Sequence, residues 1–136
     1  MIKQIMLRLP QWLFSIIVLL AILYLTLVPK PLPDTNIRLF PHVDKVVHAI
    51  MFGGLYFCLV LDFLRNRALC HQSYIIPFSI NITFFLSCIA LGGLIELIQS
   101  WLGFGRSCDI YDFYADTAGV ILFATFSKKV VCSWFK

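Results

Sequence analysis

Charged residues are scarce in this chain. They make up 13% of its 136 residues, whereas about a quarter of a typical soluble domain is charged. Hydrophobic residues make up 60%, and the mean hydropathy is +0.89. A water-soluble domain of this composition would have too few polar side chains to cover its outside. The composition therefore indicates an integral membrane protein with a single domain, residues 1–136.

The patterns of several other classes are missing. The formal net charge is +4, but the basic residues stand at the ends of apolar segments and not in a stripe interleaved with aromatic residues. Binding of nucleic acid is therefore not expected. The five cysteines form no CxxC pair, and two of them lie inside apolar runs. Because such cysteines are usually packing residues, we predict no structural disulfide.

Four apolar segments are present, at about 11–28, 46–64, 75–101 and 110–131. Each is close to the roughly 20 residues that a helix needs to cross the hydrocarbon core. Because a segment in lipid must satisfy its own backbone hydrogen bonds, each is predicted to be a helix. The basic stretch 65–74 is predicted to be a short turn. The expected fold is an all-α, integral membrane four-helix bundle.

The basic residues also predict an orientation. The first segment follows Lys3 and Arg8, as a signal peptide would, but no small-x-small cleavage site follows it, so we expect it to be kept as a span. Seven Lys or Arg residues would lie on the side of both termini and the second loop, and four on the other side. The positive-inside bias then predicts that both termini are cytoplasmic.

Polar residues gather near the predicted outward-facing ends of three segments. The set comprises Asp44 and His48 in the second segment, Glu96 and Gln99 in the third, and Asp109, Asp112 and Asp116 in the fourth. Their spacings of three and four place them on one face of each helix. A charge facing lipid would cost about 2.5 to 3.5 kcal/mol near the bilayer centre. We therefore predict that these groups face one another in one outward-opening polar pocket.

Some of these residues also have a structural explanation. Asp44 and Asp109 suit N-caps, and Asp112 suits the positive end of the fourth helix. Asp116 lies too deep for capping and needs a partner. Glu96 lies near the C-terminal end of its helix, where a carboxylate opposes the helix dipole, so a functional role is favoured there.

The remaining candidates carry more than one interpretation. His48 would face Glu96, which makes it a candidate acid, base or ligand. Gln99 is either an orienting hydrogen-bond donor or an ordinary interfacial residue. Lys45 either extends to the lipid headgroups or contacts a ligand. Arg106, in the third loop, is either an ion-pair partner or a phosphate ligand, which its planar guanidinium suits.

Three motifs resemble the VanZ-like family. DKVVH at 44–48, IELIQ at 95–99 and GRSCDIYDFYADTAG at 105–119 occur in order and at compatible spacing, and the resemblance covers about residues 44–126. The family positions fall on Asp44, His48, Glu96, Gln99, Arg106, Asp112 and Asp116. The family more often has Asn where this chain has Asp116, which adds a potential negative charge and favours a cation or a protonated group.

The resemblance implies a small envelope protein of the bacterial plasma membrane. The founding member confers low-level resistance to the glycopeptide teicoplanin, so tolerance of this kind is one expectation. In the first hypothesis the pocket binds a lipid headgroup or part of a lipid-linked cell-wall precursor. The ligand-binding residues would then be Asp44, Lys45, Gln99, Arg106 and Asp116. Membrane lipids are the expected partners.

Two alternatives stay open. In a membrane-embedded enzyme, His48, Glu96 and Asp112 would be catalytic, as general acid and base or beside a divalent cation that activates water. The sequence identifies no certain cofactor and no firm metal site, but an oxygen-rich set suits Mg²⁺ or Ca²⁺ better than zinc. In the other alternative the chain is a structural or accessory bundle without catalysis. The oligomeric state does not follow from the sequence.

Overall fold

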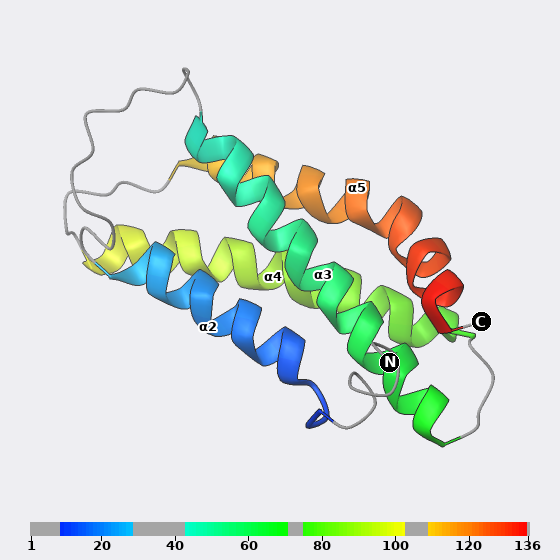
Figure 1. Cartoon of the computed structure of the whole chain (residues 1–136). Helices are drawn as coiled ribbons and strands as arrows, with labels where there is room; N and C mark the ends of the chain where they lie inside the picture. Colours follow the sequence, from blue (N-terminus) through cyan, green and yellow to red (C-terminus); the bar gives the residue numbers. More distant parts are fainter. Residues whose placement is uncertain (1–8, 29–42, 71–74, 103–108, 136) are drawn as a thin grey trace.

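The computed structural model describes residues 9–28, 43–70, 75–102 and 109–135. These residues form four helices and no strand: α2 (Leu13–Leu27), α3 (Val43–Leu69), α4 (Phe78–Leu102) and α5 (Ile110–Phe135) (Figure 1). The prediction of an all-α helical bundle is confirmed. Successive helices run in opposite directions, so α2 and α4 end where α3 and α5 begin, at the left in Figure 1.

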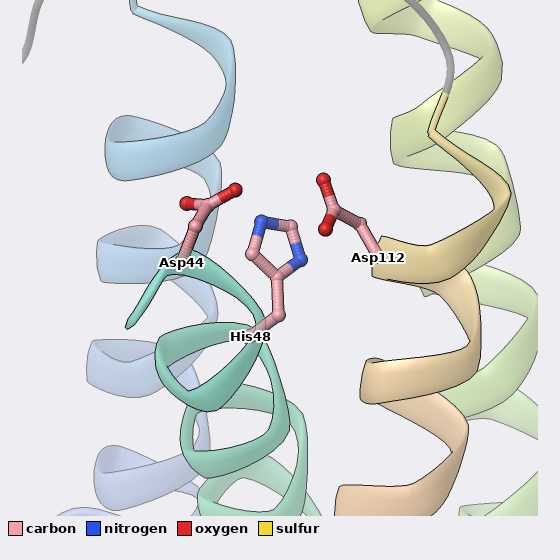
Figure 2. Close-up of side chains that lie close together, drawn as sticks. All are labelled: Asp44, His48 and Asp112. Atoms are coloured by element: carbon pink, nitrogen blue, oxygen red, sulfur yellow. The ribbon is translucent and has the colours of Figure 1, made fainter. Parts of the chain in front are cut away.

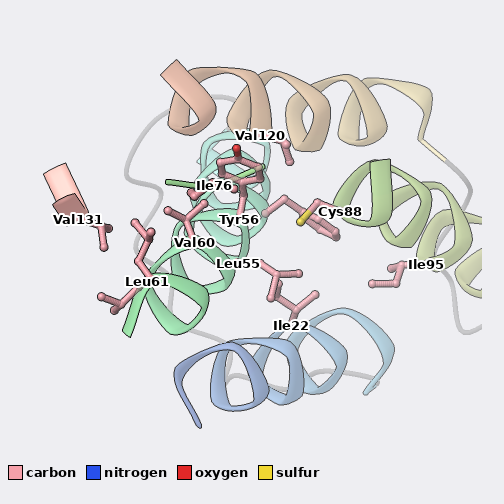
Figure 3. Close-up of a cluster of buried hydrophobic side chains, with 12 residues drawn as sticks. Ile22, Leu55, Tyr56, Val60, Leu61, Ile76, Cys88, Ile95, Val120 and Val131 are labelled. Atoms are coloured by element: carbon pink, nitrogen blue, oxygen red, sulfur yellow. The ribbon is translucent and has the colours of Figure 1, made fainter. Parts of the chain in front are cut away.

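Helix α3 lies at the centre of the bundle and contacts each of the other three helices, α5 most extensively. Its most buried apolar side chains recur every four residues, and Phe52, Tyr56, Val60 and Leu64 are all at most 1% exposed. This spacing places them on one stripe of the helix. Buried side chains of the neighbouring helices, such as Ile22 and Val120, pack around the same core (Figure 3). The central position of α3 explains why its polar residues also meet partners from more than one helix.

The contact between α3 and α5 depends on a missing side chain at Gly119. A Cβ atom built there would lie 2.0 Å from the carbonyl oxygen of Ala49 on α3, closer than any real contact. Backbones can approach in this way only where a small residue leaves room. Because Ala49 follows His48 directly, this close approach also brings the first turns of α5 against the polar start of α3.

The helices differ in how well they suit a membrane. Helices α3 and α4 are long and apolar enough to cross one. Only 17% of the most apolar part of α4 is buried in the bundle, so its apolar side chains face outward, as in lipid and unlike the core helix of a soluble protein. The 15 residues of α2 cover roughly 22 Å, and α5 is not among the helices that are long and apolar enough, so crossing by these two helices stays a prediction.

Helix α3 is longer than the predicted segment 46–64, and the predicted turn at 65–74 is wrong at its start. The helix continues to Leu69, and Arg65 is fully buried within it. The guanidinium of Arg65 pairs with Asp62, 3.3 Å away, and donates to the carbonyl oxygen of Pro10. Because its charge is compensated inside the bundle, the helix does not have to end there. Arg65 is therefore no loop cation, which weakens the charge count behind the predicted orientation.

No disulfide joins the cysteines within the described residues. Cys88 is 1% exposed and packs in the core, as expected of a packing residue. The thiol of Cys70 is exposed, whereas Cys58 and Cys132 are half-buried. Cys108 lies outside the described residues.

Candidate functional site

Charged and imidazole side chains from α3, α4 and α5 gather at the end of the bundle where α3 and α5 begin. We call this set the acidic cluster. Its members are Asp44, Lys45 and His48 of α3, Glu96 of α4, and Asp109, Asp112 and Asp116 at the start of α5. The structure thus brings together residues that the sequence predicted to share one end of the bundle.

Asp109 connects the end of α4 to the start of α5. Its side-chain Oδ1 accepts a hydrogen bond from the backbone N–H of Tyr111 at 2.9 Å, which is the predicted N-cap interaction. Its own backbone N–H donates to Glu96 Oε2 at 3.1 Å. Glu96 opposes the dipole of its own helix, but it lies against the positive end of the next one. The N-terminus of α5 therefore partly compensates the charge of Glu96.

Lys45 lies between two carboxylates of α5. Its ammonium is 2.8 Å from Asp109 Oδ2 and 2.7 Å from Asp112 Oδ1. It also lies 5.7 Å from the centre of the Tyr111 ring. The hydrogen bond from Lys45 lowers the pKa of Asp109 below its ordinary value. Lys45 therefore stabilises the start of α5, and its charge is already compensated within the cluster.

The deepest part of the cluster is formed by His48, Glu96 and Asp116, which we call the inner triad. His48 Nδ1 lies 2.9 Å from Asp116 Oδ1, and the residues are 7% and 1% exposed. Asp116 therefore has the partner that its depth required. The second oxygen of Asp116, Oδ2, and the second oxygen of Glu96, Oε1, have no hydrogen-bond partner among the described residues. Each member of the triad offers one ligand atom, and these atoms lie within 4.8 Å of one another.

Asp44 and Asp112 flank the same histidine closer to the mouth of the cluster. Figure 2 shows the ring of His48 between the two carboxylates, and one ligand atom from each residue lies within 4.8 Å of the others. Asp44 is exposed, and Asp112 is already paired with Lys45. His48 is therefore the residue that the outer and inner parts of the cluster share.

The cluster contains more negative than positive groups. Five carboxylates face one lysine and one histidine among the described residues. A buried carboxylate without a counter-charge is costly, so such sites usually bind a cation or a proton. Arg106, the other predicted cation, lies outside the described residues. The composition of the cluster therefore favours a positively charged or hydrogen-donating ligand.

The side chain of Gln99 contacts the end of α2. Its side-chain nitrogen Nε2 donates to the carbonyl oxygen of Thr26 at 2.8 Å, and the residue is 8% exposed. This hydrogen bond satisfies one of the carbonyl groups that the last turn of α2 leaves without a helical partner. Gln99 thus holds the ends of α4 and α2 together, a role that neither of its two predicted interpretations described.

Two apolar grooves adjoin the cluster on either side of α5. One, of about 500 Å³, runs between α4 and α5 and is lined by residues such as Leu94 and Phe113; among the described residues, Glu96 is its one charged lining residue. The other, of about 360 Å³, runs between α3 and α5, and Lys45 is the one charged residue that lines it within the described ranges. Each groove therefore combines an apolar wall with one charged group of the cluster.

A model of the VanZ/LLP1 family matches residues 11–132. The chain belongs to the VanZ/LLP1 family. The match includes every member of the acidic cluster and confirms the resemblance seen in the three motifs. Comparisons with curated proteins and with solved structures find no match. Together with the two long apolar helices, membership of the family indicates that this is a membrane protein.

The VanZ/LLP1 chain has a second buried polar group that the sequence analysis missed. Asp62 Oδ2 accepts hydrogen bonds from the backbone N–H and the hydroxyl of Ser15, at 2.9 and 2.8 Å. Arg65 lies beside it, with its guanidinium 5.3 Å from the centre of the Phe14 ring. We call Ser15, Asp62, Arg65 and the carbonyl of Pro10 the Asp62–Arg65 lock. The available signal was an Asp and an Arg three residues apart inside an apolar run.

Proposed function

We propose that this VanZ/LLP1 protein binds the polar headgroup of an envelope lipid, or of a lipid-linked cell-wall precursor, at the acidic cluster. The observation that carries this proposal is the position of Glu96, which belongs both to the buried cluster and to the lining of the apolar groove between α4 and α5. An amphiphile needs a polar site and an apolar wall that adjoin each other. An acyl or prenyl chain would lie in the groove while its headgroup meets the cluster.

The charges of the cluster indicate which chemical groups the bound headgroup would carry. Its surplus carboxylates accept hydrogen bonds from ammonium, hydroxyl or amide groups, so the cluster selects donors. Lys45 uses two of its hydrogen-bond donors on Asp109 and Asp112, and its ammonium carries a third. That third donor, with Arg106, would contact a phosphate. An amine- or amide-bearing headgroup next to a phosphate fits this arrangement.

The proposed cellular location and orientation follow from the family resemblance described above. We propose that the protein lies in the bacterial plasma membrane with both termini cytoplasmic, which turns the acidic cluster outward. Tolerance of teicoplanin-type glycopeptides is the expected cellular consequence if the bound headgroup belongs to a cell-wall precursor. Binding of a headgroup at the acidic cluster does not require this cellular consequence, so the binding and the tolerance are tested separately.

Binding is tested with the full chain in nanodiscs of phosphatidylethanolamine and phosphatidylglycerol. Native mass spectrometry after gentle detergent release would measure which lipid stays bound. We expect retention of the amine-bearing lipid, and a loss of about tenfold or more in Glu96→Gln, because a buried charge-assisted hydrogen bond is removed. Gly54→Ala is the control, because it lies on α3 outside the acidic cluster and a Cβ atom there meets nothing within 4 Å. Equal retention of both lipids by the wild type and by Glu96→Gln would contradict the proposal.

The tolerance is tested in cells that express the chain at matched levels. We expect teicoplanin susceptibility to rise in Glu96→Gln and His48→Ala, while both variants accumulate in the membrane like the wild type. Unchanged susceptibility in both variants, at equal accumulation, would remove the cluster from this phenotype.

A second candidate function is catalysis, favoured by the pairing of His48 with Asp116 at 2.9 Å. A carboxylate that orients an imidazole, next to a further carboxylate such as Glu96, is an arrangement that suits general acid–base chemistry. Asp112 is held by Lys45, so His48 and Glu96 would carry this chemistry. Incubation of purified protein with lipid-linked precursors, followed by mass spectrometry of the lipids, tests it. Precursors that bind and come back unchanged would exclude catalysis.

A further inference from the structure

We propose that the inner triad, His48, Glu96 and Asp116, binds one divalent transition-metal ion of the Zn²⁺ or Mn²⁺ type. This inference goes beyond the binding of a headgroup and does not depend on it. The three residues come from α3, α4 and α5 and are at most 7% exposed. One ligand atom from each lies within 4.8 Å of the other two.

Two buried carboxylate oxygens of the inner triad are available to bind a ligand. Glu96 Oε2 accepts a hydrogen bond from Asp109, and Asp116 Oδ1 is paired with His48. The other oxygen of each carboxylate, Glu96 Oε1 and Asp116 Oδ2, has no partner among the described residues. A buried acceptor without a partner destabilises a protein by about 1 to 3 kcal/mol, and more when it is charged. A cation held by the triad would supply both carboxylates with the counter-charge that they lack.

The backbone of α4 leaves room for one of these atoms. A Cβ atom at Gly92 would lie 2.9 Å from Asp116 Oδ2, so the carboxylate lies directly over this glycine. Gly92 precedes Glu96 by one helical turn and lies on the same face. A larger residue at this position would displace Asp116 from the triad without removing a ligand.

The donor set indicates the class of metal. Mg²⁺ and Ca²⁺, which the sequence suggested, select sites made entirely of oxygen. A site with one imidazole and two carboxylates suits Zn²⁺, and its carboxylates also suit Mn²⁺. In a tetrahedral site with bonds of about 2.1 Å, the ligand atoms are roughly 3.5 Å apart. Because the ligand atoms lie within 4.8 Å of one another, binding would draw the three side chains together by about 1 Å at most.

The outer set of Asp44, His48 and Asp112 meets the same geometric criterion but is the weaker candidate. Asp44 is exposed, and Asp112 Oδ1 already binds Lys45 at 2.7 Å. Since both sets use His48, one chain would hold one metal ion and not two. The inner triad has the buried, unpartnered oxygens, so the ion is assigned to it.

The test uses the purified full chain in detergent, stripped with a chelator and dialysed. Titration calorimetry with Zn²⁺, Mn²⁺, Mg²⁺ and Ca²⁺, and elemental analysis after removal of excess metal, would measure affinity and stoichiometry. We expect one equivalent of Zn²⁺ or Mn²⁺, bound at least about tenfold more tightly than Mg²⁺ or Ca²⁺. The melting temperature should rise with the bound metal, because the ligand stabilises the folded state.

Variants distinguish a specific metal site from nonspecific binding to acidic side chains. Asp116→Asn and Glu96→Gln should lower the affinity by about tenfold or more, and Gly92→Ala should lower it although every ligand is kept. Asp109→Asn is the matched control, because it removes a nearby carboxylate that is already paired, and its affinity should change by less than about threefold. Circular dichroism confirms that each variant is folded.

Two results would overturn the proposal. One is wild-type protein that holds no stoichiometric Zn²⁺ or Mn²⁺, which would leave a shared proton as the partner of the two oxygens. The other is an equal loss of affinity in Asp109→Asn and Asp116→Asn, which would show adventitious binding to acidic side chains. Lipid retention measured on the chelated protein keeps this outcome separate from the proposed function.

Discussion

Buried charged side chains are compensated differently at the two ends of the bundle. In the Asp62–Arg65 lock, one carboxylate lies beside one guanidinium, and the remaining interactions go to Ser15 and to the carbonyl of Pro10. In the acidic cluster, five carboxylates face one lysine and one histidine among the described residues. Asp62 Oδ1 has no hydrogen-bond partner among the described residues either, but it lies 3.3 Å from the guanidinium of Arg65, whereas Glu96 Oε1 and Asp116 Oδ2 have no cation of this kind beside them. A pair with balanced charges holds helices together, whereas a set with excess negative charge is a candidate for binding a ligand.

The lock has a clear structural purpose. Ser15 is the third residue of α2, so its backbone N–H is one of the four that a helix leaves unsatisfied at its start. The carboxylate of Asp62 accepts that N–H and therefore caps α2 from α3. A charge that caps one helix and is neutralised on its own helix leaves little capacity for a ligand.

The largest expected effect comes from breaking the lock. Replacing Arg65 with Ala leaves the carboxylate of Asp62 buried without its cation, which should lower the free energy of unfolding by about 3 to 5 kcal/mol. Denaturant unfolding in detergent measures it. The double variant Asp62→Leu with Arg65→Met should recover part of the loss, because no buried charge remains. A single variant as stable as the wild type would show that the pair does not hold α2 in place.

A somewhat smaller effect is expected at the contact between α3 and α5. Gly119→Ala places a methyl group against the backbone of Ala49 and should destabilise the bundle by about 1 to 3 kcal/mol. Gly54→Ala is the matched control on α3, because a Cβ atom there meets nothing within 4 Å. That variant should be neutral or slightly stabilising, since alanine favours the helix. Equal melting temperatures for the two variants would contradict the close approach.

The variant Glu96→Gln tests whether the acidic cluster is structural, as the lock is, or binds a ligand. If the cluster binds a ligand, removal of one charge should change the free energy of unfolding of the ligand-free protein by less than about 1 kcal/mol, while ligand binding is lost. If the cluster is structural, as in the third hypothesis, the same change should mainly destroy folding. Thermal unfolding of chelated, delipidated protein measures the difference.

The smallest effect is expected at Asp109. Its folded-state pKa is lowered by Lys45, so the stability that it contributes is present above the unfolded pKa and is lost as the pH falls through the folded pKa. Asp109→Asn should therefore be slightly less stable than the wild type at neutral pH, and the two should converge below about pH 4, near the ordinary pKa of aspartate. A difference that persists in acid would assign the effect to the helix cap instead.

Much of the site could be predicted because helical spacing and the alternating direction of the helices are local properties. Asp109 and Asp116 follow a spacing that places them on one face, and the order of the helices places that face at the same end as His48 and Glu96. The spacing says nothing of how each helix is rotated against its neighbours. The sequence therefore did not reveal that Lys45 binds Asp109 and Asp112, or that Asp116 binds His48.

The burial of Arg65 could not be predicted from the sequence for the same reason. An arginine after an apolar run predicts the end of a span when its partner is unknown, because an uncompensated charge belongs outside the bundle. Its pairing with Asp62 depends on the start of α2 packing against α3, and Pro10 is 55 residues away along the chain. No local pattern contains that contact.

Composition, periodicity and three motifs by themselves determined that this chain is a helical bundle of the VanZ-like type with a cluster of polar groups at the end where the second and fourth segments begin. The rise and turn of a helix, together with the cost of exposing charge to lipid, are enough for that. Only the tertiary structure decided which charges neutralise one another and which oxygens are left over. Pairing depends on distances of about 3 Å between helices, and these are set by packing at positions such as Gly92 and Gly119.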